Sequence, residues 1–341
     1  MTGLTTKGIL ESVVSGENLT DVWAESFLNE VMVGNVSEAI LASFLTAVKI
    51  KGETKEELTG FIRAMRNHAI KPKNQFDFDF LDTCGTGGDG KGSLNVSTLS
   101  ALCLASLGVK VAKHGNRSVS SLSGSSDILQ SLGYSLEKSP EVLETEFLEH
   151  GFVFLFAPSF HPAMKYAGPV RRELGFRTFF NLIGPLSNPY RPNHQIVGVY
   201  DAKLTRMVAE ILVDLGAKRV MVCHSNDGLD EFSIFDRTKY SYFNGKEILD
   251  LEFDPAELGL GVDELDKSSV FADSKEQAEK LFRSVLEGKS SAGLAMVSLN
   301  AGMALLLMGK CQNPKDGYLM AKNAFLDKKV LRFVRETLNL S

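Results

Sequence analysis

The sequence predicts an α/β fold, in which a small all-helical domain accompanies a larger α/β domain with a central, mostly parallel sheet flanked by helices. Two observations support this prediction. The first 69 residues repeat apolar side chains at helical spacing. From about residue 71, short apolar runs alternate with helical segments, as in strands joined by crossover helices. We expect the helical domain to comprise residues 1–70 with about 162–190, and the α/β domain residues 71–161 with about 191–341.

The N-terminal segment is expected to form four helices. Glycines at positions 16, 34 and 52 separate the apolar segments and mark the breaks between helices. Thr54 and Glu57 have the spacing of a capping box at the start of the fourth helix. Short loops and regular apolar spacing together predict a compact helical unit.

Alternating strands and helices are expected after residue 71. The predicted strands are 76–83, 109–115, 152–158, 194–200 and 218–224, and the predicted helices are 97–108, 126–133, 140–151 and 202–215. Asn244-Gly245 predicts a hairpin with a type I′ turn within residues 240–248. Residues 161–190 interrupt the alternation with a helical stretch, and the C-terminal part of the chain is again helical.

Composition limits the classes of function. The 341 residues are 44% hydrophobic and 23% charged, which is typical of a chain that buries a large core. The formal net charge of −5 argues against a general nucleic-acid-binding protein. It does not exclude a small anionic ligand, because such a ligand needs only a local group of donors. We therefore expect small-molecule substrates, with neither nucleic acid nor membrane as a partner.

Cysteines and apolar segments indicate the compartment. The four cysteines, at positions 84, 103, 223 and 311, form no C-x-x-C pair, so we expect free thiols in a reducing compartment, the cytoplasm. The N-terminus has no pattern of a signal peptide. The apolar stretch 292–309 is interrupted by Ser298 and Asn300, which predicts a buried helix rather than a membrane span.

The stretch DTCGTGGDGKGS, residues 82–93, raises the functional question. Gly85, Gly87 and Gly90 satisfy the dinucleotide fingerprint G-x-G-x-x-G. That fingerprint needs a helix at its third glycine and an acidic residue about 20 positions later, and lysines stand there instead. The P-loop pattern fails as well, because Gly92 follows Lys91 where a serine or threonine should bind magnesium.

A second loop strengthens the case for an anion site. Both the glycine loop and the stretch KHGNRSVSSLSGSSD, residues 113–127, follow a predicted strand and precede a predicted helix. Backbone N–H groups of such loops and the helix N-termini bind anions. An ordinary glycine-rich connection is the alternative for the first loop alone. Two donor-rich loops at neighbouring strand ends would face one crevice, which suggests a ligand with phosphate at both ends.

Five motifs, taken in order, resemble the anthranilate phosphoribosyltransferase family. They are GTGGD (85–89), NVST (95–98), KHGNRSVSS (113–121), VRRELGFRTFFNLIGPLSNP (170–189) and GLDEFS (228–233). The family belongs to a fold group that also contains the pyrimidine nucleoside phosphorylases. The resemblance implies transfer of the 5-phosphoribosyl group of phosphoribosyl pyrophosphate (PRPP) to the anthranilate amine, with release of pyrophosphate. This is the second step of tryptophan biosynthesis from chorismate.

The resemblance also implies partners and site residues. It implies two Mg²⁺ ions per monomer, bound with PRPP, and a homodimer joined through the helical domain. The implied magnesium ligands are Ser97, Asp230 and Glu231. The implied anthranilate contacts are Gly85, Asn116, Arg171, His161 and Pro185. The implied PRPP contacts are Gly85, Gly88, Asp89, Ser93, Asn95, Val96, Ser97, Thr98, Lys113, His114, Gly115, Asn116, Arg117, Ser118, Val119, Ser120, Ser121 and Ser125.

No catalytic base is expected, since the anthranilate amine is already a neutral nucleophile. Lys113, His114 and Asn116 are expected to stabilise the transition state instead. Arg171 is expected to hold the anthranilate carboxylate with two charge-assisted hydrogen bonds. Arg172 would point about 100° away around the helix and should not share that role.

Simpler interpretations remain open for single residues. Without the resemblance, Ser97 is an ordinary N-cap and the acidic pair Asp230-Glu231 a solvated turn. Two other functions also remain: a pyrimidine nucleoside phosphorylase-like enzyme, and a paralogue of the same fold that does not use anthranilate. The phosphorylase would be expected to carry K-x-S-G-R in its second loop, where this chain has KHGNR.

Overall fold

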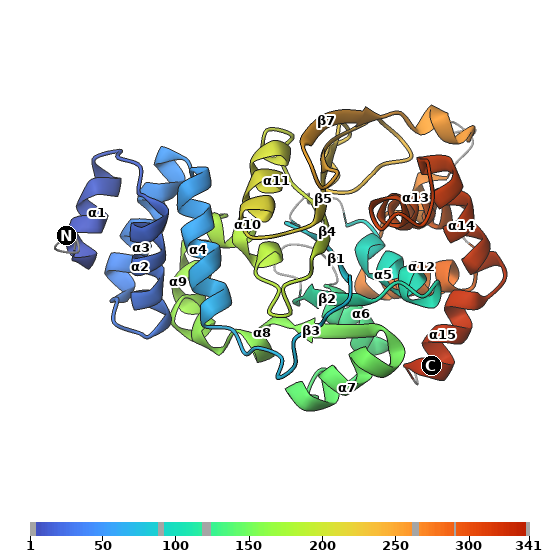
Figure 1. The fold of residues 1–341 in the computed structure, drawn as a ribbon, viewed down its shortest axis with the longest axis horizontal. Coiled ribbons are helices and arrows are strands. Elements are labelled where there is room, and N and C mark those ends of the chain that lie inside the picture. Colours follow the sequence, from blue (N-terminus) through green and yellow to red (C-terminus); the bar gives the residue numbers. More distant parts are fainter. Residues whose placement is uncertain (1–4, 88–91, 118–123, 261–265, 290, 339–341) are drawn as a thin grey trace. The chain divides into compact units, whose positions relative to one another are not determined.

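The computed structural model describes the chain except for residues 1–4, 88–91, 118–123, 261–265, 290 and 339–341 (Figure 1). The chain separates into two compact units. One unit is Met1–Lys71 with Ala157–Arg191, and the other is Pro72–Phe156 with Pro192–Ser341. The second stretch of the first unit therefore begins at Ala157, five residues before the boundary expected near 162.

The first unit is helical. Its elements are α1 Thr6–Val14, α2 Asp21–Met32, α3 Glu38–Lys51, α4 Lys55–Asn67, α8 Ala157–Phe160, the 3₁₀ helix η1 Pro162–Tyr166, α9 Gly168–Leu174 and α10 Phe179–Leu186. A hydroxyl from Thr5, Thr20, Ser37 or Thr54 caps each of the first four helices. The predicted capping box of Thr54 and Glu57 is confirmed.

Aromatic rings form the core of this unit. Phe27 of α2 stacks on Phe44 of α3 with ring centroids 3.7 Å apart. Phe61 of α4 stacks on Phe179 of α10 at 4.0 Å, and Phe44 meets both of these rings edge-on. All four side chains are buried. The stack therefore joins α10, from the second stretch of the unit, to the N-terminal helices.

Glu57 connects three parts of the helical unit. Its carboxylate is fully buried. It accepts hydrogen bonds from the backbone N–H groups of Leu19 at 2.9 Å and Thr54 at 3.0 Å, and from Lys51 Nζ at 2.9 Å. A buried carboxylate is tolerated when hydrogen bonds and an opposite charge replace its hydration. Here they join the segment before α2 and the end of α3 to the start of α4.

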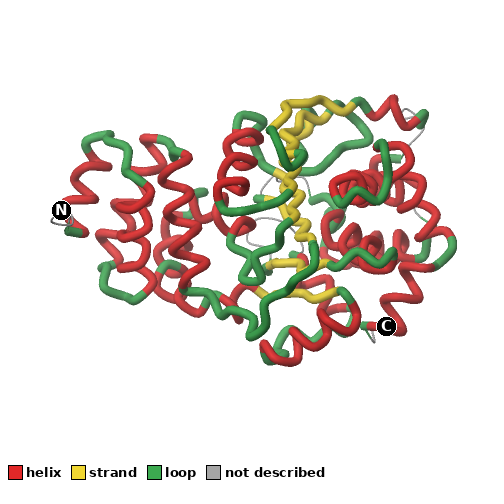
Figure 2. The backbone as a smooth tube through the Cα atoms, viewed as in Figure 1, coloured by secondary structure: helices red, strands yellow, loops and turns green. Residues whose placement is uncertain are grey.

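The second unit contains a seven-stranded sheet. The strands are β1 Leu81–Gly85, β2 Val111–Gly115, β3 Phe152–Phe156, β4 His194–Gly198, β5 Arg219–Ser225, β6 Thr238–Phe243 and β7 Ile248–Phe253. Their order is β3-β2-β1-β4-β5-β6-β7, and the first five strands in the chain run parallel. Figure 2 shows the strands in yellow, with helices in red around them. The last two pair antiparallel. The predicted fold class is confirmed.

Helices cover both faces of this sheet. They are α5 Val96–Ser106, α6 Ser125–Ser131, α7 Pro140–His150, α11 Leu204–Asp214, α12 Lys275–Leu286, α13 Ser291–Leu307, α14 Pro314–Leu326 and α15 Lys329–Thr337, with short 3₁₀ helices Pro255–Leu258 and Lys267–Ser269. In Figure 1, α11 lies on one side of the sheet, and α5, α13 and α14 lie on the other. The predicted buried helix is α13. No helix in the described part of the chain is long and apolar enough to cross a membrane.

The first predicted strand is partly wrong. β1 begins at Leu81, and residues 76–80 lie outside the strand. Their alternating phenylalanines instead gather around Phe147 of α7, with centroid distances of 5.1 Å from Phe76, 5.8 Å from Phe78 and 5.4 Å from Phe80. The period of two in FDFDF therefore reflects an aromatic cluster rather than a strand.

The predicted type I′ turn is also wrong, although the hairpin exists. Phe243 pairs with Ile248, so four residues form the connection. A type I′ turn needs positive φ at both central residues. Only Gly245 has it, at 97°, while the Asn244 side chain accepts hydrogen bonds from the N–H groups of Lys246 and Glu247. The asparagine side chain thus forms the turn in place of a left-handed backbone.

Replacing Glu57 with alanine is expected to destabilise the helical unit by about 3 kcal/mol, because it leaves two N–H groups without their acceptor and removes the carboxylate that pairs with Lys51. Urea unfolding followed by helical circular dichroism measures the change. Glu56→Ala is the control, since Glu56 is an exposed neighbour on the same helix. Equal unfolding free energies for the two variants would contradict the role given to Glu57.

Candidate active site

The glycine loop lies at the point where the strand order reverses. From β1 the chain continues to β2 and β3 on one side, and later returns to β4 and β5 on the other. The carboxyl ends of β1 and β4 lie side by side, with Gly85 paired to Gly198. The Thr86 N–H donates to the Gly198 carbonyl at 2.9 Å and continues the ladder. Such a switch point is where α/β sheets bind their ligands.

Asp230 reaches into this point from the loop after β5. Its Oδ2 accepts the N–H of Gly87 at 2.8 Å. A Cβ at Gly85 would lie 2.6 Å from the same oxygen, and a Cβ at Gly198 would overlap the carbonyl oxygen of Asp230. Both strand ends therefore need glycine, because the acidic segment passes directly against them. For Gly85 this packing role adds to the phosphate and anthranilate contacts that the sequence predicts.

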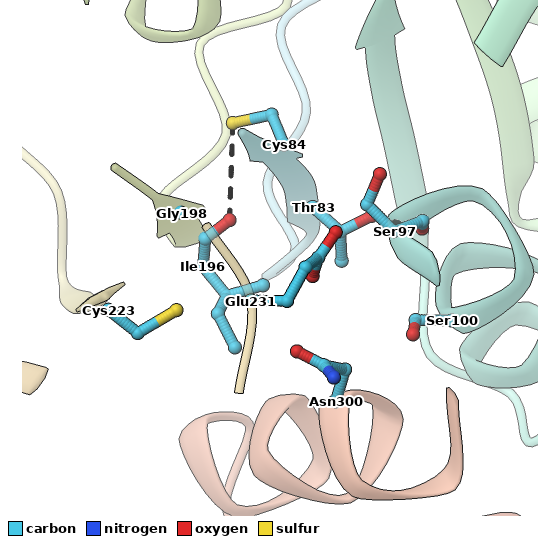
Figure 3. A pocket seen from close by; sticks show the side chains of 9 residues that line it. All are labelled: Thr83, Cys84, Ser97, Ser100, Ile196, Gly198, Cys223, Glu231 and Asn300. Carbon is cyan, nitrogen blue, oxygen red and sulfur yellow. Dashed lines mark hydrogen bonds between the residues drawn. The ribbon is translucent and has the colours of Figure 1, made fainter. Parts of the chain in front are cut away.

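Glu231, the second acidic residue, lines a small cavity beneath the loop. The cavity has a volume of about 10 Å³, enough for roughly one water molecule. Figure 3 shows the Glu231 carboxylate directed toward the side formed by Thr83 and Ser97. The lining residues are Thr83, Cys84, Ser97, Ser100, Ile196, Gly198, Cys223, Glu231 and Asn300. The structure thus brings together two of the predicted magnesium ligands, Ser97 and Glu231, and places Asp230 next in the chain.

The donor set suits a hard cation that brings its own oxygen ligands. Among the described residues, no group of three or more His, Cys, Asp or Glu side chains could hold a metal ion. Asp230, Glu231 and Ser97 offer only oxygen atoms. Magnesium is typically held by one or two carboxylates, while water and substrate phosphate complete its shell. The residues present therefore fit magnesium bound together with a phosphate ligand.

Lys113 is engaged by the protein itself. It is 2% exposed, and its ammonium donates to the Thr83 carbonyl at 2.6 Å and to Ser97 Oγ at 3.1 Å. Burial lowers the pKa of Lys113, and the charges of Asp82 and Glu231 oppose that shift. Lys113 thus joins β1 to the first turn of α5 and holds the Ser97 hydroxyl.

Asp82 and Thr83 also position the site and were missed from the sequence. Asp82 is fully buried and accepts the backbone N–H of His114 at 3.2 Å. The Thr83 hydroxyl donates to the backbone oxygen of Ser97 at 2.9 Å. A charged residue inside a buried strand was the available signal for Asp82, because such a residue needs a partner.

The N-terminus of α5 forms one wall of the site. Asn95 is its N-cap, but the Asn95 side chain makes no capping hydrogen bond, and Val96 and Thr98 are buried. The preceding residues pair with a later segment: Ser93 is bridged to Phe271, and Leu94 N–H donates to the Val270 carbonyl at 2.7 Å. The predicted contacts Gly88 and Asp89 lie outside the described residues.

The second loop begins at Gly115, the last residue of β2. The Asn116 carbonyl accepts the Ser125 hydroxyl at 3.4 Å, which closes the loop onto α6. The exposed Arg117 guanidinium pairs with Asp127 at 3.1 Å and donates to Gln130 at 3.2 Å. Arg117 is therefore tied to α6. The predicted contacts Ser118, Val119, Ser120 and Ser121 lie outside the described residues.

The helical unit carries the remaining predicted residues. Arg171 is half-buried over the Phe180 ring at 5.0 Å, and burial lowers its pKa, whereas Arg172 is exposed. His161 is 5% exposed, and burial lowers its pKa to about 4 against the effect of a hydrogen bond with the Ser187 backbone. His161 is therefore neutral at pH 7.

Pro185 lies inside α10, next to a carbonyl that a buried arginine binds. Arg66 donates twice to the Leu186 oxygen, from Nε at 3.0 Å and from Nη2 at 2.7 Å. Burial, with the charge of Arg191, lowers the pKa of Arg66 to about 10. Arg66 thus provides hydrogen-bond donors for a backbone carbonyl at the C-terminal end of the proline-containing helix.

Comparisons with known proteins identify the family of this chain. Residues 77–328 match the α/β domain of a glycosyl transferase family, and residues 7–69 match the helical bundle domain of a glycosyl transferase family. The chain is 42% identical over 324 residues to an anthranilate phosphoribosyltransferase of Geobacillus sp. (strain WCH70), covering 95% of this chain and 94% of that one.

Solved structures of similar proteins show the same fold. The anthranilate phosphoribosyltransferase of Thermus thermophilus superposes with a TM-score of 0.88 at 36% identity, covering 97% of this chain and 98% of that one. The anthranilate phosphoribosyltransferase of Saccharomyces cerevisiae, in complex with PRPP and Mg, superposes with a TM-score of 0.88 at 25% identity. The match covers 98% of this chain and 97% of that one. The similarity extends over 95–98% of the chain, and the chain belongs to the anthranilate phosphoribosyltransferase family.

Proposed function

We propose that this chain transfers the 5-phosphoribosyl group of PRPP to the amine of anthranilate and releases pyrophosphate, as the second step of tryptophan biosynthesis. The observation that carries the proposal is the approach of Asp230-Glu231 to the glycine loop at the switch point of the sheet. A pentosyl transfer of this kind needs a site for a diphosphate and its cation, and the donor set fits one. The phosphorylase alternative is not favoured, because the second loop and the relatives are those of phosphoribosyltransferases.

The pyrophosphate side of PRPP is assigned to the glycine loop and α5. The N-terminus of α5, an 11-residue helix, favours a bound anion. The Asn95 side chain does not cap that helix. The second loop, from Lys113 to Ser125, is assigned to the ribose 5-phosphate and the reaction centre. The glycine loop and the N-terminus of α5 stabilise the negative charge on the pyrophosphate as it departs.

Magnesium is assigned to Ser97, Asp230 and Glu231. We propose two ions per monomer, as the family resemblance implies, with Asp230 and Glu231 as the two adjacent carboxylates that would hold them beside a diphosphate. When bound, magnesium neutralises charge on the departing pyrophosphate. The chain's own contribution is orientation: Lys113 holds the Ser97 hydroxyl, and Gly87 N–H holds one Asp230 oxygen.

Anthranilate is assigned to Arg171, with His161, Pro185, Gly85 and Asn116. The half-buried Arg171 guanidinium suits a carboxylate, which it can bind with two parallel hydrogen bonds. The anthranilate amine attacks the ribose C1 as a neutral nucleophile, so the neutral His161 need not remove a proton. Holding both substrates in line supplies much of the rate. We place the reaction in the cytoplasm, where the four free cysteines stay reduced.

The helical unit is proposed to bind a second copy of the chain. A groove of about 530 Å³ lies along α1 and α3, and Lys51 is the one charged residue among the described residues that line it. At its rim Val14 is 65% exposed and Ile50 is 82% exposed. Lys51 turns its ammonium to Glu57 and Asn18, which leaves the groove apolar. A homodimer through this unit, as the family resemblance implies, would cover these side chains.

The reaction is tested by following the loss of anthranilate fluorescence with PRPP and Mg²⁺. The chain is expected to consume anthranilate only with magnesium present. Asp230→Asn with Glu231→Gln should lose nearly all activity, because the ion loses both carboxylates. Asp236→Asn with Glu252→Gln removes two acidic groups elsewhere and should remain active. No decay by the folded wild-type protein would reject anthranilate as the acceptor, and equal magnesium dependence in both double variants would reject the metal ligands.

Arg171→Ala is expected to raise KM for anthranilate by roughly 10–100-fold, the effect of losing a charge-assisted hydrogen-bond pair. KM for PRPP should stay near the wild-type value. Arg171→Lys should recover only part of the loss, because lysine keeps the charge but not the planar pair of donors. Arg172→Ala is the control on the exposed neighbour. An unchanged KM for anthranilate in Arg171→Ala would exclude the assignment.

Light scattering is expected to give the mass of a dimer for the wild-type chain and of a monomer for Ile50→Glu, which buries a charge in the proposed interface. Lys49→Glu makes a larger charge change on the neighbouring exposed position of α3 and should stay dimeric. A monomeric wild type, or a dimeric Ile50→Glu variant, would rule out this interface.

A further inference from the structure

We propose that Asn300 is a positioning residue that holds the acidic pair Asp230-Glu231 in place for magnesium. Asn300 acts through the backbone, because it binds the main chain of the residue that follows the pair. The inference rests on the proposed magnesium role of that pair. Nothing in the sequence points to it, because there Asn300 is only a polar interruption of an apolar helix.

The side-chain amide of Asn300 contacts the backbone of Phe232 at two points. The Phe232 N–H donates to Asn300 Oδ1 at 3.0 Å, and Asn300 Nδ2 donates to the Phe232 carbonyl at 2.8 Å. Both backbone polar groups of Phe232 are therefore bound by a single side chain. Two parallel bonds fix the orientation of the backbone as well as its position, and Phe232 directly follows Glu231.

The side chain of Asn300 is itself fixed. Its Nδ2 also donates to the Met296 carbonyl, one turn earlier in α13, at 2.9 Å. Asn300 is 5% exposed, and its helical neighbours are buried. A buried amide in an apolar helix is costly unless its hydrogen bonds are made. Here three of them are made, so the amide is a preorganised support.

The same helix also supports the third proposed ligand. The Ser100 hydroxyl of α5 donates to the Val297 carbonyl of α13 at 3.4 Å, and α5 carries Ser97 in its first turn. Ser97, Glu231, Ser100 and Asn300 line one cavity (Figure 3). α13 thus contacts both the helix that carries the hydroxyl ligand and the segment that carries the carboxylates.

The acidic pair needs such support because it lies in the connection between β5 and β6, outside any helix or strand. Gly87 N–H holds the Asp230 carboxylate on one side of the pair. Asn300 holds the backbone on the other side. Supporting residues of this kind orient metal ligands, and their loss typically lowers metal affinity by about 10–100-fold.

Asn300→Ser is the sharpest test. A serine at this position can still donate to the Met296 carbonyl, as Ser43 does to Ala39 at 2.8 Å in α3, but it is too short to reach Phe232. The expected result is a rise of at least about tenfold in the half-saturating Mg²⁺ concentration, with activity largely restored at high Mg²⁺ and KM for anthranilate unchanged. Calorimetric titration of the protein with Mg²⁺, in the presence of pyrophosphate, should show the same loss of affinity for Mg²⁺ without turnover.

Two controls separate this proposal from others. Ser298→Ala removes a buried hydroxyl from the same helix and should keep the wild-type magnesium dependence. Asp230→Asn tests the metal assignment itself: if wild type and Asp230→Asn bind Mg²⁺ equally, the assignment of Asp230 as a magnesium ligand fails. If Asp230→Asn is impaired but Asn300→Ser and Asn300→Ala bind Mg²⁺ as wild type does, only the role of Asn300 is overturned.

Failure of both Asn300 variants to fold would also overturn the role of Asn300, since Asn300 would then serve the fold and not the ion site.

Discussion

The site depends on the contact between residue 230 and the ends of β1 and β4. The two strands end side by side, and the acidic segment that follows β5 passes directly against their ends. Gly85 and Gly198 make that passage possible, because a side chain at either position would occupy the space of Asp230. The Gly87 N–H then binds the Asp230 carboxylate. Part of the glycine richness of the loop is thus a packing requirement within the protein.

A network of buried polar groups supports the same region. Lys113, Asp82 and Thr83 are all nearly fully buried, and each bonds to a neighbouring element of the site. Burying a lysine lowers its pKa and is costly, so the cost must be offset by carbonyl and carboxylate partners. The result is a set of ligand-bearing segments whose positions are fixed before a substrate binds.

Much of the fold could be predicted because its signals are local. Helical spacing, the capping box at Thr54, and the alternation of apolar strands with helices each depend on residues close in sequence, and the structure bears them out. The pattern FDFDF led to a wrong strand prediction because it, too, was interpreted locally. Its alternation is also local, but its cause is Phe147, which is about 70 residues away in the chain.

The site was predictable only in part for a similar reason. The motifs bring Ser97 and Glu231 to one cavity, as the family resemblance implies. The residues that hold them were not predictable, because their partners are distant. Asn300 binds the backbone of a residue 68 positions away, and backbone partners leave no mark on the sequence of the partner. The resemblance implies that Lys113 contacts a ligand, and nothing in the sequence indicates the hydrogen bonds from its ammonium to Thr83 and Ser97.

The helical unit presents its arginine by a different physical means. Phe180 lies under the Arg171 guanidinium at 5.0 Å, and Phe180 itself stacks on Phe179 at 4.6 Å. Phe179 stacks in turn on Phe61 of α4. The aromatic core of the unit thus continues to the guanidinium, so that the rings which stabilise the helices also restrict the arginine. A guanidinium restricted by a ring in this way loses less side-chain entropy when it binds a planar carboxylate.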